Sequence, residues 1–158
     1  MPVQFEFPQD VQTVFDTLTD PQFLVDRCIA LGELDAECDV EQRGEVTVVK
    51  LVREIRRDIP RLLQKIFSDT QVTDMTEEWQ PHKGGWKGHW VLEVRGQPVT
   101  VEADFSLEPT RKGGSCYSVT HRAKARIPLV GGQVEKFILS QTSGGAEDEL
   151  TYLKNFLD

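Results

Sequence analysis

Hydrophobic positions along the chain follow a short alternating stretch, then helical spacing, then a long alternating region, and finally helical spacing again. Residues 3–7 alternate apolar and polar side chains and stop at Pro8, which is typical of a short strand. Apolar residues then recur at helical spacing in two runs, one after Asp10 and one after Asp20, and either aspartate can cap a helix. The second run ends at Gly32, so the pattern predicts two short helices.

From residue 33 to about 127 the chain has the period-two pattern of strands. The matching segments are separated by glycine, proline, aspartate or Lys-Gly turn signals, and they lie near 33–42, 45–56, 70–80, 85–96, 98–109 and 115–127. In the segment 98–109 the apolar and polar side chains take opposite faces, which indicates a sheet that is solvated on one side. Together with residues 3–7, these segments predict a curved antiparallel sheet of six or seven strands.

The last stretch, residues 132–158, is helical in pattern, but its inward stripe is interrupted. The stripe begins and ends with apolar residues and carries small or polar ones in its middle, namely Gln141, Gly145, Asp148 and Glu149. Gly144 and Gly145 each cost about 1 kcal/mol relative to alanine inside a helix. Either the helix bends at these glycines and turns the carboxylates into water, or it continues and faces something other than side chains.

The length and charge of the chain restrict the class of protein. With 158 residues it has the size of one domain, so we expect a single ligand-binding domain over 1–158. The 18 Lys+Arg and 26 Asp+Glu give a net charge of −8, which disfavours general attraction to nucleic acid or anionic lipid. The three cysteines are widely spaced without a CxxC pair, and no signal-peptide or membrane-span pattern occurs, so we expect a cytoplasmic protein.

The order of the predicted elements and two local stretches resemble the START and birch-pollen-allergen-like superfamily, the SRPBCC or helix-grip fold. One stretch is IPLVGGQVE at 127–135, which leads from the last strand into the terminal helix. The other is IPRLL at 59–63 followed by EEW at 77–79. Both resemble a bacterial family of unknown function inside that superfamily. The resemblance implies an α+β fold in which the long C-terminal helix roofs a hydrophobic cavity in the sheet.

This cavity would bind or carry a small hydrophobic or lipid-like ligand without catalysis. Its walls and roof are predicted from the inward faces of the strands and of the terminal helix. The expected ligand-binding residues are Trp86, Trp90, Val101, Phe105, Tyr117, Val119, His121, Phe137, Ile138, Gln141 and Gly145.

Two other classes of function stay open on the sequence. His121 and Tyr117 share the apolar face of their strand, so they could be the acid–base groups of an enzyme resembling polyketide cyclases or dehydratases. Against this, no carboxylate at a fixed spacing marks a catalytic partner, and a cavity histidine is often only hydrogen-bonded. A protein-interaction module, using the outer face of the sheet, is the third class.

A basic segment, residues 52–67, departs from the acidic character of the chain. It contains Arg53, Arg56, Arg57, Arg61 and Lys65 against Glu54 and Asp58. Leu62, Leu63, Ile66 and Phe67 lie beside them at helical spacing, so the segment could form a lid over the cavity. Arg56, Arg57, Arg61 and Lys65 could also provide weak contact with anionic membrane, although a solvated basic face is the simpler interpretation.

Metal and cofactor motifs are not found in the sequence. His82, His89 and His121 have no HxxxH or HExxH spacing. Gly131-Gly132 precedes the terminal helix, but the continuation of a phosphate-binding loop is absent because Gln133 and Val134 follow. We therefore expect neither a metal nor a cofactor, and the oligomeric state is not predicted.

Overall fold

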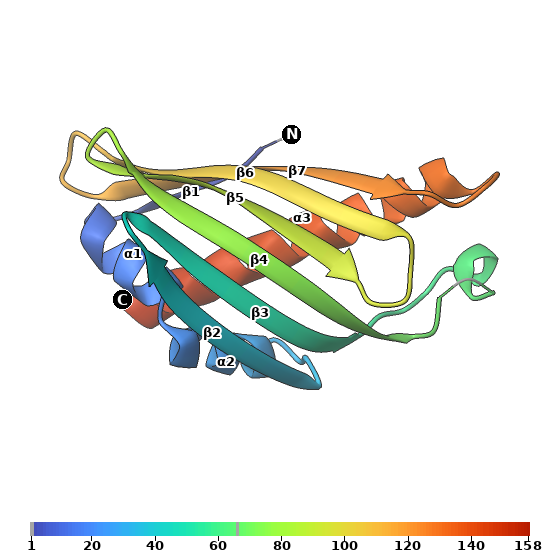
Figure 1. Cartoon of the computed structure of the whole chain (residues 1–158). Coiled ribbons are helices and arrows are strands. Elements are labelled where there is room, and N and C mark those ends of the chain that lie inside the picture. The colour runs from blue at the N-terminus through green and yellow to red at the C-terminus, as the bar shows by residue number, and fades with distance from the viewer. Residues whose placement is uncertain (1, 66) are drawn as a thin grey trace.

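A computed structural model describes residues 2–65 and 67–158 and shows an α+β fold, a curved sheet wrapped around a long helix (Figure 1). The sheet has seven antiparallel strands, as the alternating pattern predicts. They are β1 (Val3–Phe7), β2 (Asp35–Arg43), β3 (Val46–Arg56), β4 (Thr70–His82), β5 (Gly85–Val94), β6 (Val99–Pro109) and β7 (Ser115–Ala125).

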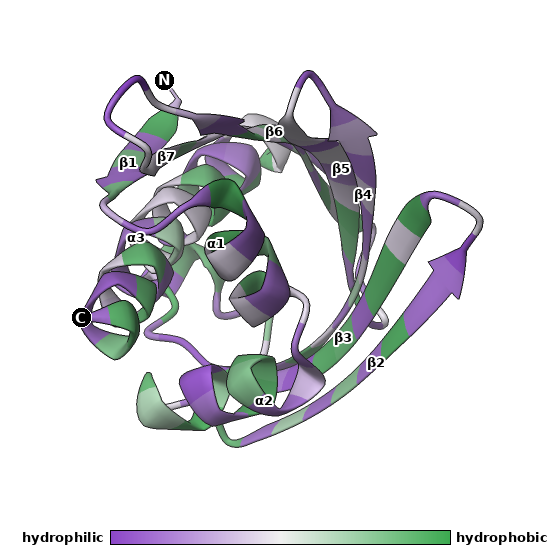
Figure 2. Cartoon of the chain, turned by 90° about the vertical axis from the view of Figure 1, so that its left-hand side faces the viewer, coloured by the Kyte–Doolittle hydropathy of each residue, from purple (hydrophilic) through white to green (hydrophobic). Residues whose placement is uncertain are grey.

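Strand order follows the chain except for β1, which adds to the far edge of the sheet beside β7. The order is β1-β7-β6-β5-β4-β3-β2, so β1 and β2 are the two edges. Hydrophilic and hydrophobic bands alternate along the strands, because successive side chains point to opposite faces (Figure 2). The apolar face is the concave one, and all the helices lie on that side of the sheet (Figure 2).

Two short helices, α1 (Val11–Leu18) and α2 (Pro21–Ala30), connect β1 to β2. Asp10 caps α1 by accepting a hydrogen bond from the backbone N–H of Thr13 at 2.8 Å. Asp20 caps α2 in the same way through the N–H of Gln22 at 3.0 Å. Both caps were predicted from the sequence, and they fix where the chain turns under the sheet.

The terminal helix α3 (Gly131–Leu157) crosses the concave face and continues through Gly144 and Gly145 (Figure 1). The helix is therefore not interrupted at these glycines, and the expectation that its carboxylates point into water holds for Asp148 but not for Glu149. Glu149 pairs with two buried arginines inside the fold, while Asp148 is exposed.

The basic segment between β3 and β4 contains the 3-10 turn η1 (Arg61–Leu63), and no longer helix is assigned among the residues described there. Leu63 and Phe67 are buried in the main hydrophobic core, whereas Leu62 is 60% exposed. Ile66 lies outside the described residues. Ile59, Leu63 and Phe67 belong to the main hydrophobic core, so these residues anchor the segment to the rest of the fold.

The core lies between the sheet and the helices and is aromatic near β5 and β6. Trp79 and Phe105 meet edge to face with ring centroids 4.6 Å apart. Gly88 on β5 leaves room for this pair, since a Cβ there would lie 2.2 Å from the Phe105 ring and 2.3 Å from the carbonyl oxygen of Glu78. The glycine is thus required by packing.

We expect Gly88→Ala to lower the free energy of unfolding by about 1–3 kcal/mol, the usual cost of overpacking. Gly144→Ala is the matched control, because a Cβ at Gly144 meets no atom within 4 Å and alanine favours a helix. Urea unfolding followed by tryptophan fluorescence compares the two. A Gly88→Ala protein as stable as the wild type would show that the sheet is not tightly packed there.

Candidate functional site

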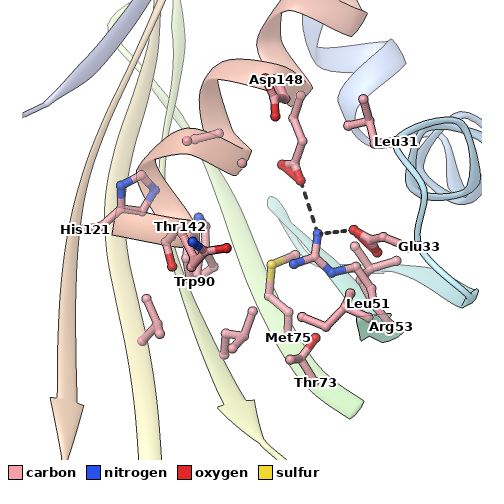
Figure 3. A pocket seen from close by; sticks show the side chains of 18 of the residues that line it. Leu31, Glu33, Leu51, Arg53, Thr73, Met75, Trp90, His121, Thr142 and Asp148 are labelled. Atoms are coloured by element: carbon pink, nitrogen blue, oxygen red, sulfur yellow. Dashed lines mark hydrogen bonds and ion pairs between the residues drawn. The ribbon is translucent and has the colours of Figure 1, made fainter. Parts of the chain in front are cut away.

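A cavity of about 440 Å³ lies between the concave face of the sheet and α3 (Figure 3). Side chains from α1, α2, α3 and the strands β3 to β7 line it. Its volume falls in the range of about 300–1,000 Å³ that is usual for small-molecule sites. The curvature of the sheet and the small residues of α3 together keep this space unfilled.

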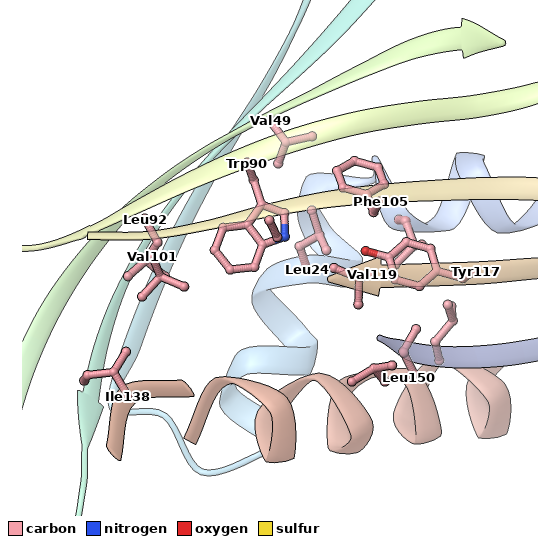
Figure 4. Close-up of a cluster of buried hydrophobic side chains, with 14 of the residues drawn as sticks. Leu24, Val49, Trp90, Leu92, Val101, Phe105, Tyr117, Val119, Ile138 and Leu150 are labelled. Carbon is pink, nitrogen blue, oxygen red and sulfur yellow. The ribbon is translucent and has the colours of Figure 1, made fainter. Parts of the chain in front are cut away.

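One wall of the cavity is apolar and comes from β5, β6 and β7. Trp90, Leu92, Val101 and Val119 form this wall, and all are less than 10% exposed (Figure 4). Ile138 and Leu150 of α3 face these four residues across the cavity and extend the apolar surface. We call these six residues the apolar wall.

Eight of the eleven predicted ligand-binding residues line the cavity: Trp90, Val101, Tyr117, Val119, His121, Ile138, Gln141 and Gly145. The period-two and helical patterns therefore oriented most of these side chains correctly. Whether they bind a ligand stays a prediction.

Trp86, Phe105 and Phe137 are not among the lining residues. The Trp86 ring stacks on Phe15 of α1 at 4.0 Å, so α1 covers it. Phe105 is 4% exposed and packs between Trp79 and Tyr117. Phe137 packs against the core from a partly buried position. The periodic patterns predict which face of the sheet or helix each of these side chains is on. They do not predict whether another side chain packs over it and fills the space between the layers.

The lid residues Leu62, Leu63 and Phe67 do not line this cavity either. Leu63 and Phe67 anchor the β3–β4 segment in the core, and Leu62 points to solvent. The lid over this cavity, as predicted, is therefore not supported by the positions of these three residues.

Gly144 and Gly145 form the thin part of the roof. Both line the cavity, and a Cβ at either position would meet no atom within 4 Å. A close-packed helix would have large side chains at such inward positions. Gly144 is itself exposed, so Gly145, together with Ala146, preserves the space between α3 and the sheet.

The opposite side of the cavity carries a network of buried charges. Glu149 accepts from Arg53 at 3.1 Å and lies 3.4 Å from Arg27, and Arg53 also pairs with Glu33 at 3.2 Å (Figure 3). Arg27 is 7% exposed, and the Arg53 side chain is 13% exposed. Buried charges need such partners, because desolvation of an unpaired ion costs several kcal/mol.

The network shifts the pKa of each carboxylate differently. Burial favours the neutral form of Glu149, but Arg27 and Arg53 outweigh it and lower its pKa. For Glu33 burial dominates over the nearby Arg53, so its pKa is raised. Glu149 is thus held as the anion that joins α3 to α2 and β3.

Glu77 of β4 is a third carboxyl group in the cavity lining. It is 9% exposed and accepts a hydrogen bond from the indole N–H of Trp79 at 2.6 Å. Burial raises its pKa from 4.5 to about 7, although the Trp79 bond opposes this. Glu77 therefore changes charge near neutral pH.

Several buried polar atoms in the lining have no hydrogen-bond partner among the described residues. They include both amide atoms of Gln71, Oγ1 of Thr73, Nε of Arg57 and Nδ1 of His121. Gln71 is 6% exposed and Thr73 is 1% exposed. Unpaired buried polar atoms are rare in folded proteins, so this group provides the polar contacts that a ligand could satisfy.

His121 and Tyr117 both line the cavity, but they cannot act on each other. They are four residues apart on β7, which separates them by about 13 Å along the strand. Burial lowers the pKa of His121 and raises that of Tyr117, so both favour their neutral forms. His121 packs beside the Trp90 ring at 5.5 Å.

Sequence reasoning did not single out Arg27, Glu33, Gln71, Thr73 and Glu77 as cavity residues. For β4 a signal was present, because Gln71, Thr73 and Glu77 share the period-two face of Trp79. Arg27 follows Phe23 by one helical turn and so shares its buried face. Neither periodicity was used to place these residues in the cavity, because charged and amide side chains are expected to point to solvent.

The basic residues of the β3–β4 segment divide into two groups. Arg56, Arg61 and Lys65 are exposed, whereas Arg57 is partly buried and donates to Gln141 of α3 at 3.2 Å. Among the residues described, no cluster suited to a metal ion is found, and no helix is long and apolar enough to cross a membrane.

Comparison with solved structures shows the fold. A START superfamily protein from Mycobacterium smegmatis matches with a TM-score of 0.61 and 13% identity, covering 100% of this chain and 98% of that one. A conserved protein from Geobacillus kaustophilus has a TM-score of 0.58 and 17% identity, with 98% and 91% covered. Ara h 8.0201 has a TM-score of 0.53 and 14% identity, with 96% and 95% covered.

These matches confirm the START-like helix-grip fold that the sequence resemblance implied. A search of curated proteins finds no match to the sequence. A family model described as a protein of unknown function, DUF2505, matches residues 2–157. The chain therefore belongs to the DUF2505 family and has the START-like fold.

Proposed function

We propose that this protein binds or carries a small hydrophobic or lipid-like molecule in the cavity under α3. The observation that carries the proposal is Gly145 on the inward stripe of α3, where a core helix would place a large side chain. An unfilled apolar space is unfavourable on its own, because its lining loses van der Waals contacts. A ligand would restore those contacts.

The apolar wall supports a ligand with substantial hydrocarbon or aromatic surface. Burial of apolar area contributes about 25 cal/mol per Å², so a few such contacts give useful affinity. The opposite polar side supplies orientation. Binding without chemistry is the proposed role, because His121 and Tyr117 are too far apart along β7 to form an acid–base pair.

Gly145→Leu is expected to fill the cavity and abolish binding of phenylnaphthylamine, a neutral dye that fluoresces in apolar surroundings. Gly132→Leu is the matched control, since Gly132 is an exposed glycine of α3 outside the cavity lining. Fluorescence titration measures the dye, and circular dichroism checks the fold. Unchanged dye binding by a folded Gly145→Leu protein would contradict the proposal.

Glu77 makes stability depend on pH in a direction opposite to that of a paired carboxylate. Its folded pKa of about 7 exceeds the ordinary 4.5, so the unfolded chain loses the proton first as pH rises. The free energy of unfolding should therefore fall between about pH 4.5 and pH 7 and stay level above. At 1.36 kcal/mol per pKa unit the loss is at most about 3 kcal/mol.

Glu77→Gln should remove this loss, so its gain over the wild type should be larger at pH 8 than at pH 5. Urea unfolding at the two pH values measures it. Glu78→Gln on the outer face is the control, because that side chain is exposed. An equal difference between Glu77→Gln and wild type at both pH values would mean that Glu77 is ionised throughout.

A second candidate role, contact with anionic membrane during ligand exchange, is favoured by Leu129. This residue is fully exposed and has φ of 71°, a conformation that favours glycine over leucine. The exposed Leu62 follows Arg61 in η1, and both loops lie at the right-hand end in Figure 1. Two apolar side chains beside exposed basic residues are a combination typical of weak membrane contact.

Flotation with vesicles of anionic lipid should show weak, salt-sensitive binding, because exposed charges are screened over about 8–10 Å at physiological ionic strength. Arg61→Glu with Lys65→Glu should remove it, at about 1 kcal/mol per basic residue. Lys87→Glu with Lys124→Glu is the matched control, because both lysines are exposed on strands β5 and β7, away from the β3–β4 segment. No flotation of the wild type at low salt would rule out this second role.

A further inference from the structure

We propose that the ligand is an amphiphile with a single negative charge, whose anionic headgroup is held by Arg57 and Gln71 while its hydrocarbon part lies on the apolar wall. This inference rests on the proposed function and specifies the chemical class of the ligand. Three observations support it: the position of Arg57, the balance of charges in the cavity, and the unpaired polar atoms beside it.

Arg57 lies just beyond β3 but continues its ladder, since its backbone N–H donates to the carbonyl of Asp69 at 2.8 Å. Alternation along the strand puts its side chain on the same face as Arg53 and Ile55. The guanidinium therefore extends under α3, where Nη1 donates to Oε1 of Gln141 at 3.2 Å. A basic residue of the β3–β4 segment thus belongs to the cavity.

The charges around the cavity leave Arg57 without an acidic partner. Glu149 is shared by Arg27 and Arg53, and Glu33 pairs with Arg53. Within the described part of the chain no carboxylate forms an ion pair with Arg57, whose contact is the neutral amide of Gln141. Burial, together with the nearby Arg53, lowers the pKa of Arg57 by more than Glu33 raises it, so the surrounding charges do not fully compensate this cation.

Gln71 provides a further hydrogen-bonding group next to Arg57. Gln71 pairs in register with Ile55, so its side chain is diagonally opposite Arg57 on the concave face, and Thr73, which pairs with Arg53, lies one pair further along. The Gln71 amide and the Thr73 hydroxyl have no partner among the described residues although both residues are over 90% buried. A carboxylate beside Arg57 can accept from its guanidinium and from the Gln71 amide, whereas Thr73 lies opposite Arg53, about 13 Å along the strand from Arg57.

The size of the charge that fits is limited by the neighbouring carboxylates. Arg57 has no ion-pair partner among the described residues, while Glu33, Glu149 and, above about pH 7, Glu77 line the same cavity and repel additional negative charge. A monoanion is therefore favoured over a phosphate dianion. The apolar wall of Trp90, Leu92 and Val101 faces the rest of the space and suits a hydrocarbon chain.

Displacement of phenylnaphthylamine at about pH 6, where Glu77 is mostly neutral, by dodecanoic acid, dodecanol and dodecylamine tests the headgroup on the unaltered protein. The three compounds share one chain and differ in charge. The acid should bind about tenfold or more tightly than the alcohol, as expected for charge-assisted hydrogen bonds, and the amine should bind most weakly. This comparison does not depend on whether a variant folds.

Arg57→Gln should weaken the acid about tenfold and leave the dye and the alcohol within about twofold, because only the acid uses the charge. Arg61→Gln, which changes an exposed arginine outside the cavity, should leave all ligands unchanged. Equal loss of all ligands in Arg57→Gln would assign this arginine a structural role and overturn the proposal.

The outcomes separate this inference from the proposed function. If the wild type binds the dye but binds dodecanoic acid no more tightly than dodecanol, the proposed headgroup site is wrong. The proposal that the cavity binds a hydrophobic ligand then still stands. If the wild type binds neither the dye nor any of the three amphiphiles, the proposed function itself fails, and this inference fails with it.

Discussion

The pairing of Glu149 with Arg27 and Arg53 is the interaction on which the rest of the site depends. It joins α3 to α2 and to β3 across a space that side chains do not fill. A helix with glycines and carboxylates on its inward stripe gains little from hydrophobic packing there. The ion pairs hold this part of α3 over the sheet, and removal of one partner from a buried pair typically costs about 3–5 kcal/mol.

This constraint also explains why the cavity has two unlike sides. The ends of α3 are anchored by apolar residues such as Val134 and Leu153, which are completely buried. Between these two anchors, α3 forms ion pairs with Arg27 and Arg53 at one side of the cavity. At the other side it leaves the space next to the apolar wall unfilled. A cavity bounded in this way can change occupant without loss of the core, because the packing that stabilises the fold lies elsewhere.

The sequence predicted the fold well because each element has its own local signal. Alternation in 98–109, the caps at Asp10 and Asp20, and the helical spacing of the terminal segment all agree with the structure. Local patterns give the face of each side chain. They do not give the distance between layers, which is why Trp86 and Phe105 were assigned to the cavity although neighbouring rings cover them.

The charged part of the site was beyond sequence reasoning for a different reason. Residues 27, 33, 53 and 149 come together only in the folded chain, and no spacing rule connects them. In the absence of a visible partner, solvent exposure is the expected state of a charged side chain. The buried network shows that a carboxylate on a helical stripe can mark a tertiary ion pair, as Glu149 does.

Native mass spectrometry of the protein purified from its own host tests the central claim most directly. The claim is that the space under α3 holds a small amphiphile. The account predicts a second mass peak, a few hundred daltons above the protein, that disappears on denaturation and is absent from the Gly145→Leu variant. A wild-type protein that carries no such species and takes up none from a lipid extract of the host would contradict the account.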